Sequence, residues 1–381
     1  MVWFWLLVAP AVILAAGSLA GGRARAAYAR QRLSQEPEHL PPASVIVPVK
    51  GSDEGLRENL AALASLDYPD YELIIVAQSG NDIPPGVLPD KAKVVLAHTE
   101  HFYGSEKVAN LTAAVHATRK QSEILAFADS DGLATKRWLR SLIAPLADEG
   151  VGASTGYRWF IPEPPTFWSI LRAVWDAVPA GMMGPGDNAF AWGGATAIRK
   201  QVFQDAGILG YWKNAVSDDY TLSAALHSAG LTIAYAPGAL VPSREHITAP
   251  GLLSWTRRQM ILTRVYKPRQ WWLGLAAHFI YCGAMSASGW AIGTGRSVGW
   301  WTLVAQLAPG MFKGARRAGL ARLSLAEHDG WFRHYGWVHA AAVPLATWLW
   351  LIALLSSAFG NVIEWRGYRY ILKNGLAVKR V

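Results

Sequence analysis

Charged residues are missing from long parts of the sequence. Four stretches contain no Asp, Glu, Lys or Arg, and they cover residues 1–22, 271–295, 297–312 and 335–363. A bilayer core needs about 20 apolar residues, so the first, second and fourth stretches are long enough to span it, whereas the third is marginal. Tryptophans gather at their ends, as in Trp271-Trp272 and Trp300-Trp301, where an aromatic belt would lie. The pattern predicts an integral membrane protein.

Cysteine is nearly absent. The single residue, Cys282, lies inside a predicted span, which excludes an internal disulfide and fits a cytoplasmic environment. The first apolar stretch has no basic segment before it, and the positive residues follow it in GGRARAAYARQR. A cleaved signal peptide has the opposite order, so we expect an uncleaved anchor with the following residues in the cytoplasm.

Several nucleotide-binding and nucleic-acid-binding signatures are also missing. No G-x-G-x-x-G follows the first predicted strand and no P-loop is present, which disfavours a dinucleotide oxidoreductase or a P-loop enzyme. The net charge is +9, but the basic residues cluster at the ends of the apolar stretches, where they suit anionic lipid headgroups. Without a recognition motif, this charge does not indicate a nucleic-acid partner.

The part of the chain from residue 41 to about residue 250 has a different pattern, in which short apolar strands alternate with helical segments. Strands are expected at ASVIVPVKG, ELIIVAQSGND, AKVVLAH and EILAFADSDG, and helices at LRENLAALASL and KVANLTAAVHATRK. This order predicts an α/β domain with a mostly parallel sheet covered by helices on both faces. Ligands of such sheets bind at the carboxyl ends of the strands, where the chain has Lys50, Gly51, Asp53, Gln78, Asp82, Asp129 and Asp131.

Two aspartates one residue apart, Asp129 and Asp131, follow the strand ILAFA. Alternation along an extended chain points both side chains the same way, so their charges repel unless a cation lies between them. A divalent metal is one explanation and a solvated turn is the other. Further along, Asp218 and Asp219 follow Ser217 in the first turn of a predicted helix, where acids are also common as caps.

Taken together and in order, these segments resemble the ceramide glucosyltransferase family and its bacterial relatives, including hopanoid-associated glycosyltransferases. The similar segments are VIVPVKGSDEGLRENLAALASLDYPDYELIIVAQSGND, EKVANLTAA, ADSDG, GGATAIRK, VSDDY and, near the end, WRGYRYIL. Ser105 stands where the family usually has Asn. The resemblance implies a GT-A fold with transmembrane and interfacial helices. It also implies an inverting transferase that moves a hexose, foremost glucose, from a UDP-sugar to the hydroxyl of a lipid, foremost ceramide.

Three alternatives stay open beside that function. One is the glycosylation of a hopanoid or another lipid with another UDP-sugar, the second is a processive polysaccharide synthase, and the third is a non-catalytic membrane scaffold. Three or four predicted spans are few for a polysaccharide pore, which disfavours the synthase. A scaffold is disfavoured because the chain retains the acidic residues of the family motifs. These residues are Asp82, Asp129, Asp131 and Asp219.

The resemblance also assigns roles to single residues. Asp131 and Asp129 are expected to hold Mg²⁺ or Mn²⁺, and Asp219, with its neighbour Asp218, is expected to provide the general base. Arg258 or Arg257 is expected to stabilise the leaving group, although the family's Q/R-x-x-R-W motif is imperfect in SWTRRQMILTR, which leaves the register open. The expected UDP-sugar contacts are Pro48, Lys50, Gly51, Asp82, Lys107, Asn110, Asp129 and Gly194.

The predicted organisation has five parts. They are a transmembrane anchor at 1–22, a cytoplasmic GT-A catalytic domain at 41–250, an interfacial segment with the arginine motif at 251–270, transmembrane or re-entrant helices at 271–363, and a basic tail at 364–381. Residues 297–312 are expected to cross the membrane incompletely, which keeps the tail in the cytoplasm. The expected partners are a UDP-sugar donor and a lipid acceptor in the bilayer.

Overall fold

The computed structural model describes residues 2–98, 104–186, 189–373 and 377–380. The chain divides into two compact units that are each assembled from distant segments. Unit 1 comprises Met1–Ala26, Phe160–Gly181 and His246–Gly360, and unit 2 comprises Ala27–Trp159, Met182–Glu245 and Asn361–Val381. The division differs from the predicted contiguous catalytic range, because residues 160–181 belong to unit 1 and the tail belongs to unit 2.

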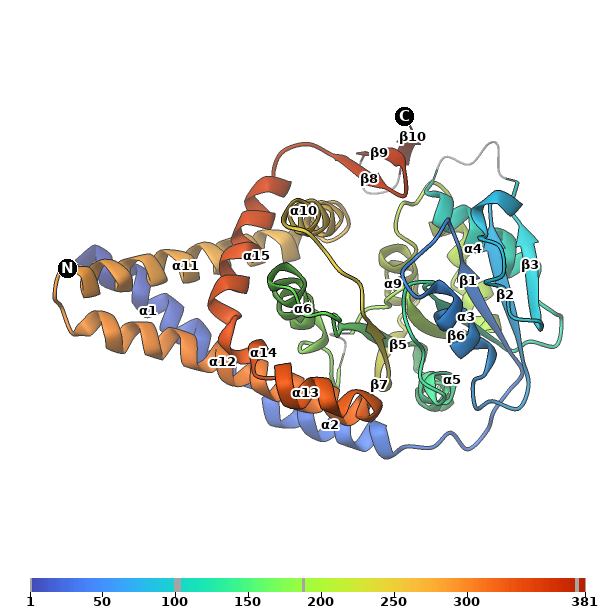
Figure 1. Cartoon of the computed structure of the whole chain (residues 1–381), viewed down its shortest axis with the longest axis horizontal. Helices are drawn as coiled ribbons and strands as arrows, with labels where there is room; N and C mark the ends of the chain where they lie inside the picture. Colours follow the sequence, from blue (N-terminus) through green and yellow to red (C-terminus); the bar gives the residue numbers. More distant parts are fainter. Residues whose placement is uncertain (1, 99–103, 187–188, 374–376, 381) are drawn as a thin grey trace. The chain divides into compact units, whose positions relative to one another are not determined.

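Unit 2 contains a seven-stranded sheet with the order β3-β2-β1-β4-β6-β5-β7, drawn in Figure 1. The first four strands are parallel, namely β1 (Ala43–Pro48), β2 (Tyr71–Ala77), β3 (Ala92–Leu96) and β4 (Ile124–Ala128). Strand β6 (Ala195–Arg199) pairs antiparallel with both β4 and β5 (Val151–Phe160), and β7 (Thr232–Ser243) ends the order. The predicted α/β fold with its mostly parallel sheet is confirmed, and the antiparallel strands come later in the chain.

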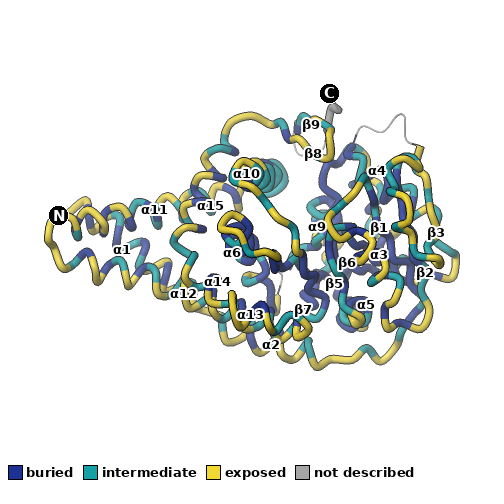
Figure 2. The backbone as a smooth tube through the Cα atoms, viewed as in Figure 1, coloured by how far each residue is buried: buried dark blue, intermediate teal, exposed yellow. Residues whose placement is uncertain are grey.

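Both faces of the parallel strands are covered. Val45 and Val47 pack in one core with α3 (Leu56–Ala64) and α5 (Trp138–Ile143). The alternate residue Ile46 points to the opposite face, where α4 (Glu106–His116) packs on β1, β2 and β3. Because both faces are covered, β4 is buried along its whole length and β1 along most of it, as Figure 2 shows for β1. Charged side chains follow the ends of both strands.

Further elements of unit 2 follow these strands. Helices α7 (Lys200–Asp205), α8 (Ile208–Trp212) and α9 (Asp218–Ser228) lie between β6 and β7 in the sequence. The tail forms a separate antiparallel sheet from β8 (Val362–Trp365), β9 (Tyr368–Lys373) and β10 (Ala377–Arg380). As predicted, a helix opens at this point: Ser217 is the N-cap of α9, and its side chain accepts a hydrogen bond from the Tyr220 backbone N–H.

Unit 1 is helical. Helices α1 (Val2–Gly17), α11 (Pro268–Gly293) and α12 (Val298–Ser324) pack against one another and run side by side in Figure 1. Helix α12 is continuous over 27 residues, so the stretch predicted to cross incompletely is the first half of one longer helix. By length and composition, one described helical stretch, Val2–Ser34, which contains α1 and α2 (Gly22–Ser34), is long and apolar enough to cross a membrane.

Other helices of unit 1 form a second apolar core. This core joins α6 (Phe167–Ala180), α10 (Ala249–Tyr266) and α15 (Val343–Ser357), with the rings of Trp175 and Trp350 stacked 4.2 Å apart. Because α6 contributes Leu171, Val174 and Trp175 to this core, residues 160–181 pack with the helical unit. The stretch predicted as the last span is divided between α14 (Val338–Ala341) and the 15-residue α15.

Candidate active site

The two aspartates after β4 converge, as alternation along the strand predicts. Asp129 Oδ2 and Asp131 Oδ1 lie 3.3 and 2.6 Å from the same guanidinium nitrogen, Nη2 of Arg158. Both side chains are mostly buried, with exposed fractions of 22% and 14%. A cation therefore lies between the carboxylates, and here an arginine provides it. The solvated-turn explanation does not fit these two side chains.

Sequence reasoning missed Arg158. It lies on β5 in a strand of otherwise buried residues, and its side chain is only 12% exposed. Glu245 lies 3.8 Å from its other terminal nitrogen, and the ring of Trp192 lies 5.3 Å from the guanidinium carbon. The available signal was a charged residue within the apolar run GYRWF, because buried arginines are rare without acidic partners.

Lys107 connects the aspartate pair to the start of helix α9. Its Nζ lies 2.8 Å from Asp129 and 3.3 Å from Asp218, and its side chain is 13% exposed. Burial alone lowers the pKa of Lys107, but the two carboxylates outweigh burial and raise that pKa above its ordinary value. Burial raises the pKa of Asp129, but Lys107 and Arg158 outweigh it and lower the pKa. Lys107 is therefore a charged member of the site and not a solvated surface lysine.

The two acids at the start of α9 differ in environment. Burial raises the pKa of Asp218 to about 6; Lys107 opposes this shift, and the charges of Asp219 and Asp129 add to it. Asp219 is half-buried, and its Oδ1 accepts hydrogen bonds from Ser217 Oγ and from the Tyr220 backbone N–H at 2.7 Å. Asp218 is thus held by the charge of Lys107, whereas Asp219 accepts hydrogen bonds in the first turn of its own helix.

The glycine pair before β6 lies against this cluster. A Cβ added to Gly193 would clash with the Asp218 carboxylate and lie 2.8 Å from Lys107 Nζ. A Cβ added to Gly194 would clash with the Trp192 ring and lie 2.7 Å from Asp129 Oδ2. Both positions thus need glycine because the backbone approaches the charged side chains closely.

The loop after β1 lies next to the loop after β2. Gly51 has a left-handed backbone with φ 68°, and its N–H donates to the Asp82 carbonyl at 2.7 Å. The Asp82 carboxylate accepts from the backbone and hydroxyl of Ser79, both at 3.0 Å, so it stabilises its own turn. Pro48 ends β1, and Lys50 forms an ion pair with Glu106 at 2.5 Å.

The other predicted donor contacts lie on α4. Asn110 is buried, and its side-chain oxygen accepts from Gln78 Nε2 at 2.8 Å. Ser105, which stands where the related family has Asn, caps α4, because its hydroxyl accepts from the Val108 N–H and donates to the Val216 carbonyl at 2.7 Å. The hydroxyl therefore performs a capping task that serine and asparagine share.

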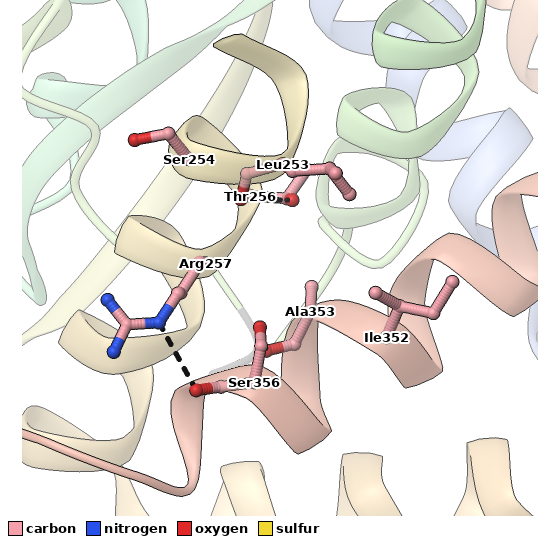
Figure 3. A pocket seen from close by; sticks show the side chains of 7 residues that line it. All are labelled: Leu253, Ser254, Thr256, Arg257, Ile352, Ala353 and Ser356. Atoms are coloured by element: carbon pink, nitrogen blue, oxygen red, sulfur yellow. Dashed lines mark hydrogen bonds between the residues drawn. The ribbon is translucent and has the colours of Figure 1, made fainter. Parts of the chain in front are cut away.

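The two arginines of the predicted motif belong to unit 1, on α10. Arg257 donates to the carbonyl of Ser356 at 3.2 Å, in the last turn of α15, and to that of Phe359 at 2.9 Å, just after the helix. It also borders a cavity of about 320 Å³ between α10 and α15, shown in Figure 3. Arg258 is half-buried on the same helix. The cavity is lined by Leu253, Ser254, Thr256, Arg257, Ile352, Ala353 and Ser356.

The mostly parallel sheet and the helices that cover it have the GT-A architecture. The chain belongs to glycosyl transferase family 21, whose sequence profile matches residues 3–378. The resemblance stated from the motifs is thereby confirmed at the level of the family. No curated protein sequence matches the chain as a relative.

Two solved structures are among those that the chain matches. The chain is similar to a mannosyltransferase from Pyrobaculum calidifontis, solved with GDP-mannose and Mn²⁺. The identity is 18% over 89% of this chain and 99% of that one, and the TM-score is 0.51. It also matches glucosyl-3-phosphoglycerate synthase from Mycobacterium tuberculosis, solved with Mn²⁺ and UDP-glucose, at 16% identity. That match covers 59% of this chain and 79% of the other with a TM-score of 0.42.

Proposed function

We propose that the chain is a membrane-bound inverting glycosyltransferase that moves a hexose from a UDP-sugar to the hydroxyl of a lipid. Glucose and ceramide are the first donor sugar and acceptor to test, and a hopanoid is the second acceptor. The observation that carries this proposal is the convergence of Asp129 and Asp131 on one cation at the carboxyl end of β4, beside Lys107 and Asp218. Membership of the glycosyltransferase family supports the reaction class.

The aspartate pair fits Mg²⁺ or Mn²⁺. Its oxygens are hard donors, and they already converge on a single positively charged atom. The described residues contain no group of three or more His, Cys, Asp or Glu side chains that is placed to hold a metal. Two carboxylates suffice, because Mg²⁺ is commonly bound by one or two carboxylates plus substrate phosphates. Asp131 and Asp129 would hold the ion, which when bound neutralises the diphosphate leaving group.

The reaction is a single displacement at the anomeric carbon. The acceptor oxygen forms the new glycosidic bond while the bond to the diphosphate breaks, and a base removes the hydroxyl proton. We assign the base to Asp219, because it is more exposed than its neighbour and its Oδ1 alone takes part in the capping bonds that the structure shows. Asp218 instead holds Lys107 in place.

The negative charge of the departing diphosphate also needs cationic side chains near it. Lys107 and Arg158 are the buried cations of the cluster, and both contact Asp129, so they can turn toward a phosphate oxygen with little movement. We also assign Arg258, or Arg257 as the alternative, to stabilise the departing diphosphate from the membrane side. The donor contacts are assigned to Pro48, Lys50, Gly51, Asp82, Asn110 and Gly194.

A membrane location is supported by the surface of unit 1. Large apolar side chains are exposed on α1, α11 and α12, including Leu6 at 70%, Trp272 at 63% and Trp301 at 75%. A soluble protein rarely exposes so many large apolar side chains on neighbouring helices. We therefore place these helices in the bilayer. We also propose that unit 2 lies in the cytoplasm, where UDP-sugars are made.

The function is tested with purified protein, a panel of UDP-sugars with GDP-mannose added, and ceramide and hopanoid acceptors in lipid vesicles. Mass spectrometry of the products identifies the sugar and the acceptor together. Transfer from UDP-glucose to ceramide supports the full proposal, and transfer to a hopanoid corrects the acceptor alone. A soluble polymer as product would indicate a polysaccharide synthase. Absence of transfer from every donor, in a protein that is folded, would indicate a scaffold.

A further inference from the structure

The tail of the chain contacts the candidate site within unit 2. Strands β8 and β9 form a hairpin in which Trp365 pairs with Tyr368, so Arg366 and Gly367 are its two turn residues. Arg366 Nη2 lies 2.5 Å from Asp53 Oδ1, and Asp53 is only 5% exposed. Burial alone lowers the pKa of Arg366, but Asp53, with Asp131 and Glu245, outweighs it and raises the pKa. The turn of the hairpin is thus tied to the loop after β1.

Asp53 connects Arg366 to the segment that carries the aspartate pair. Its second oxygen, Oδ2, accepts from the hydroxyl of Ser130 at 2.5 Å. Ser130 lies between Asp129 and Asp131, and its carbonyl accepts from Asn59 Nδ2 at 3.0 Å. The residue between the two aspartates is therefore fixed through its side chain and its backbone.

Two further contacts hold the hairpin against the same part of unit 2. The Lys50 ammonium lies 3.7 Å from the centre of the Tyr368 ring, and the Tyr370 hydroxyl accepts from the Glu106 N–H at 3.4 Å. Lys50 and Glu106 form an ion pair with each other. Three residues of the hairpin thus contact the loop after β1 and the start of α4.

The backbone conformation of the turn is a second, independent observation that favours a role for Arg366. Arg366 has φ 51° and Gly367 has φ 80°, so both residues are left-handed. Two-residue hairpin turns of this kind favour Asn-Gly or Asp-Gly, because other side chains adopt positive φ at a cost. An arginine at the first turn position is best explained by its contact with Asp53.

We propose that Arg366 is a positioning residue of the donor site, which holds the Asp129–Asp131 loop through Asp53 and Ser130. The tail is therefore a required part of that site. This inference rests on the proposed function, since it assumes that the aspartate pair receives the metal and the diphosphate. Without Arg366, the buried Asp53 carboxylate would lose its cation and repel Asp129 and Asp131, which would widen the pair.

The test compares Arg366→Ala with Arg369→Ala in the full-length protein. Arg369 is exposed on the same hairpin and pairs across the strands with Glu364, so it is a matched control. Titration calorimetry measures the Kd of Mn²⁺ alone and of UDP with Mn²⁺, and initial rates give KM for the donor and kcat. We expect Arg366→Ala to raise both Kd values and KM by about tenfold or more, and Arg369→Ala to leave them within about twofold.

A double variant shows whether the effect passes through Asp53. Asp53→Asn combined with Arg366→Ala should be no worse than the more damaging single change, because the two residues act through one contact. If Arg366→Ala does not fold, Arg366→Gln replaces it. Unchanged Kd and KM in a folded Arg366 variant, even with a lower melting temperature, would overturn the inference. A wild-type protein that binds neither UDP nor Mn²⁺ would instead overturn the proposed function.

Discussion

Two arginines in the two units of this chain have opposite surroundings. Arg158 in unit 2 lies between Asp129 and Asp131, with Glu245 nearby. Arg257 in unit 1 donates to two backbone carbonyls, those of Ser356 and Phe359. Sequence reasoning singled out Arg257 and missed Arg158.

Arg158 neutralises the charge of two carboxylates, whereas Arg257 donates hydrogen bonds to carbonyls at the end of a helix. The carbonyls in the last turn of a helix lack partners within the helix, and an arginine that donates to them stabilises the local structure. Burying two carboxylates and an arginine costs hydration free energy, which their attraction offsets only in part. Such a cluster is therefore better explained by a function than by stability. The predictions below test this contrast, beginning with the largest expected effect.

The largest effect is expected from Asp131→Asn. The change removes one of the two converging charges, and we expect activity to fall by about 10²–10³-fold or more while the protein stays monodisperse. EDTA should abolish transfer by the wild type, and Mg²⁺ or Mn²⁺ should restore it. Asp205→Asn, an exposed carboxylate on α7, serves as the control. Full activity in EDTA would show that Arg158 and Lys107 suffice without a metal.

The next effect concerns the base. Asp219→Asn should lower kcat by about 10²–10⁴-fold, because no group then removes the acceptor proton, whereas UDP binding should stay within about twofold. Initial rates and calorimetry measure the two quantities separately.

Asp218 offers a clear contrast in the same experiment. A base works in its ionised form, and burial together with the neighbouring acids raises the pKa of Asp218 to about 6. If Asp218 were the base, kcat/KM of the wild type would fall about tenfold per pH unit below pH 6, and Asp218→Asn would abolish that limb. Such a profile would move the role from Asp219 to Asp218.

A smaller effect is expected from Gly193→Ala. The added Cβ would clash with the Asp218 carboxylate and crowd Lys107, so we expect kcat/KM to fall by about 10–100-fold through the displaced charges. Gly210→Ala in helix α8 is the matched control, because its Cβ would meet nothing within 4 Å and helices prefer alanine. Equal activities of the two variants would show that the close approach at residue 193 has no functional role.

The smallest effect on catalysis is expected from Arg257→Ala. The change leaves two carbonyls without this donor, so we expect the free energy of unfolding to fall by about 1–3 kcal/mol, measured by thermal melting in detergent. Arg258→Ala should show the converse behaviour, with kcat reduced by about tenfold and an unchanged melting temperature. A larger loss of kcat in Arg257→Ala would assign the motif arginine to position 257.

Local pattern predicted the first half of unit 2 well. The strands β1 to β4 and the helices α3 and α4 lie where short apolar runs and apolar residues at helical spacing predict them, because each segment's own residues carry that pattern. The direction of the Asp129 and Asp131 side chains followed from the same alternation. The cap at Ser217 likewise depends only on residues within its own turn.

The parts that sequence reasoning missed depend on residues distant in the chain. Arg158 approaches the aspartates only because β5 and β6 return antiparallel beside β4. The excursion through α6 depends on a core with α10 and α15, and the contact of Arg366 with Asp53 joins the two ends of unit 2. No periodicity within a window of ten residues encodes such pairings.

Unit 2 is assembled from three separate segments of the chain, which has a consequence during synthesis of the protein. A chain emerges from the ribosome from its N-terminus, and early segments fold while later ones are still being made. Asp53 is among the first residues of unit 2 to emerge, and its partner Arg366 follows only after all the helices of unit 1. If Arg366 positions the donor site, a nascent or truncated chain cannot consume sugar nucleotide until its helical unit has been synthesised.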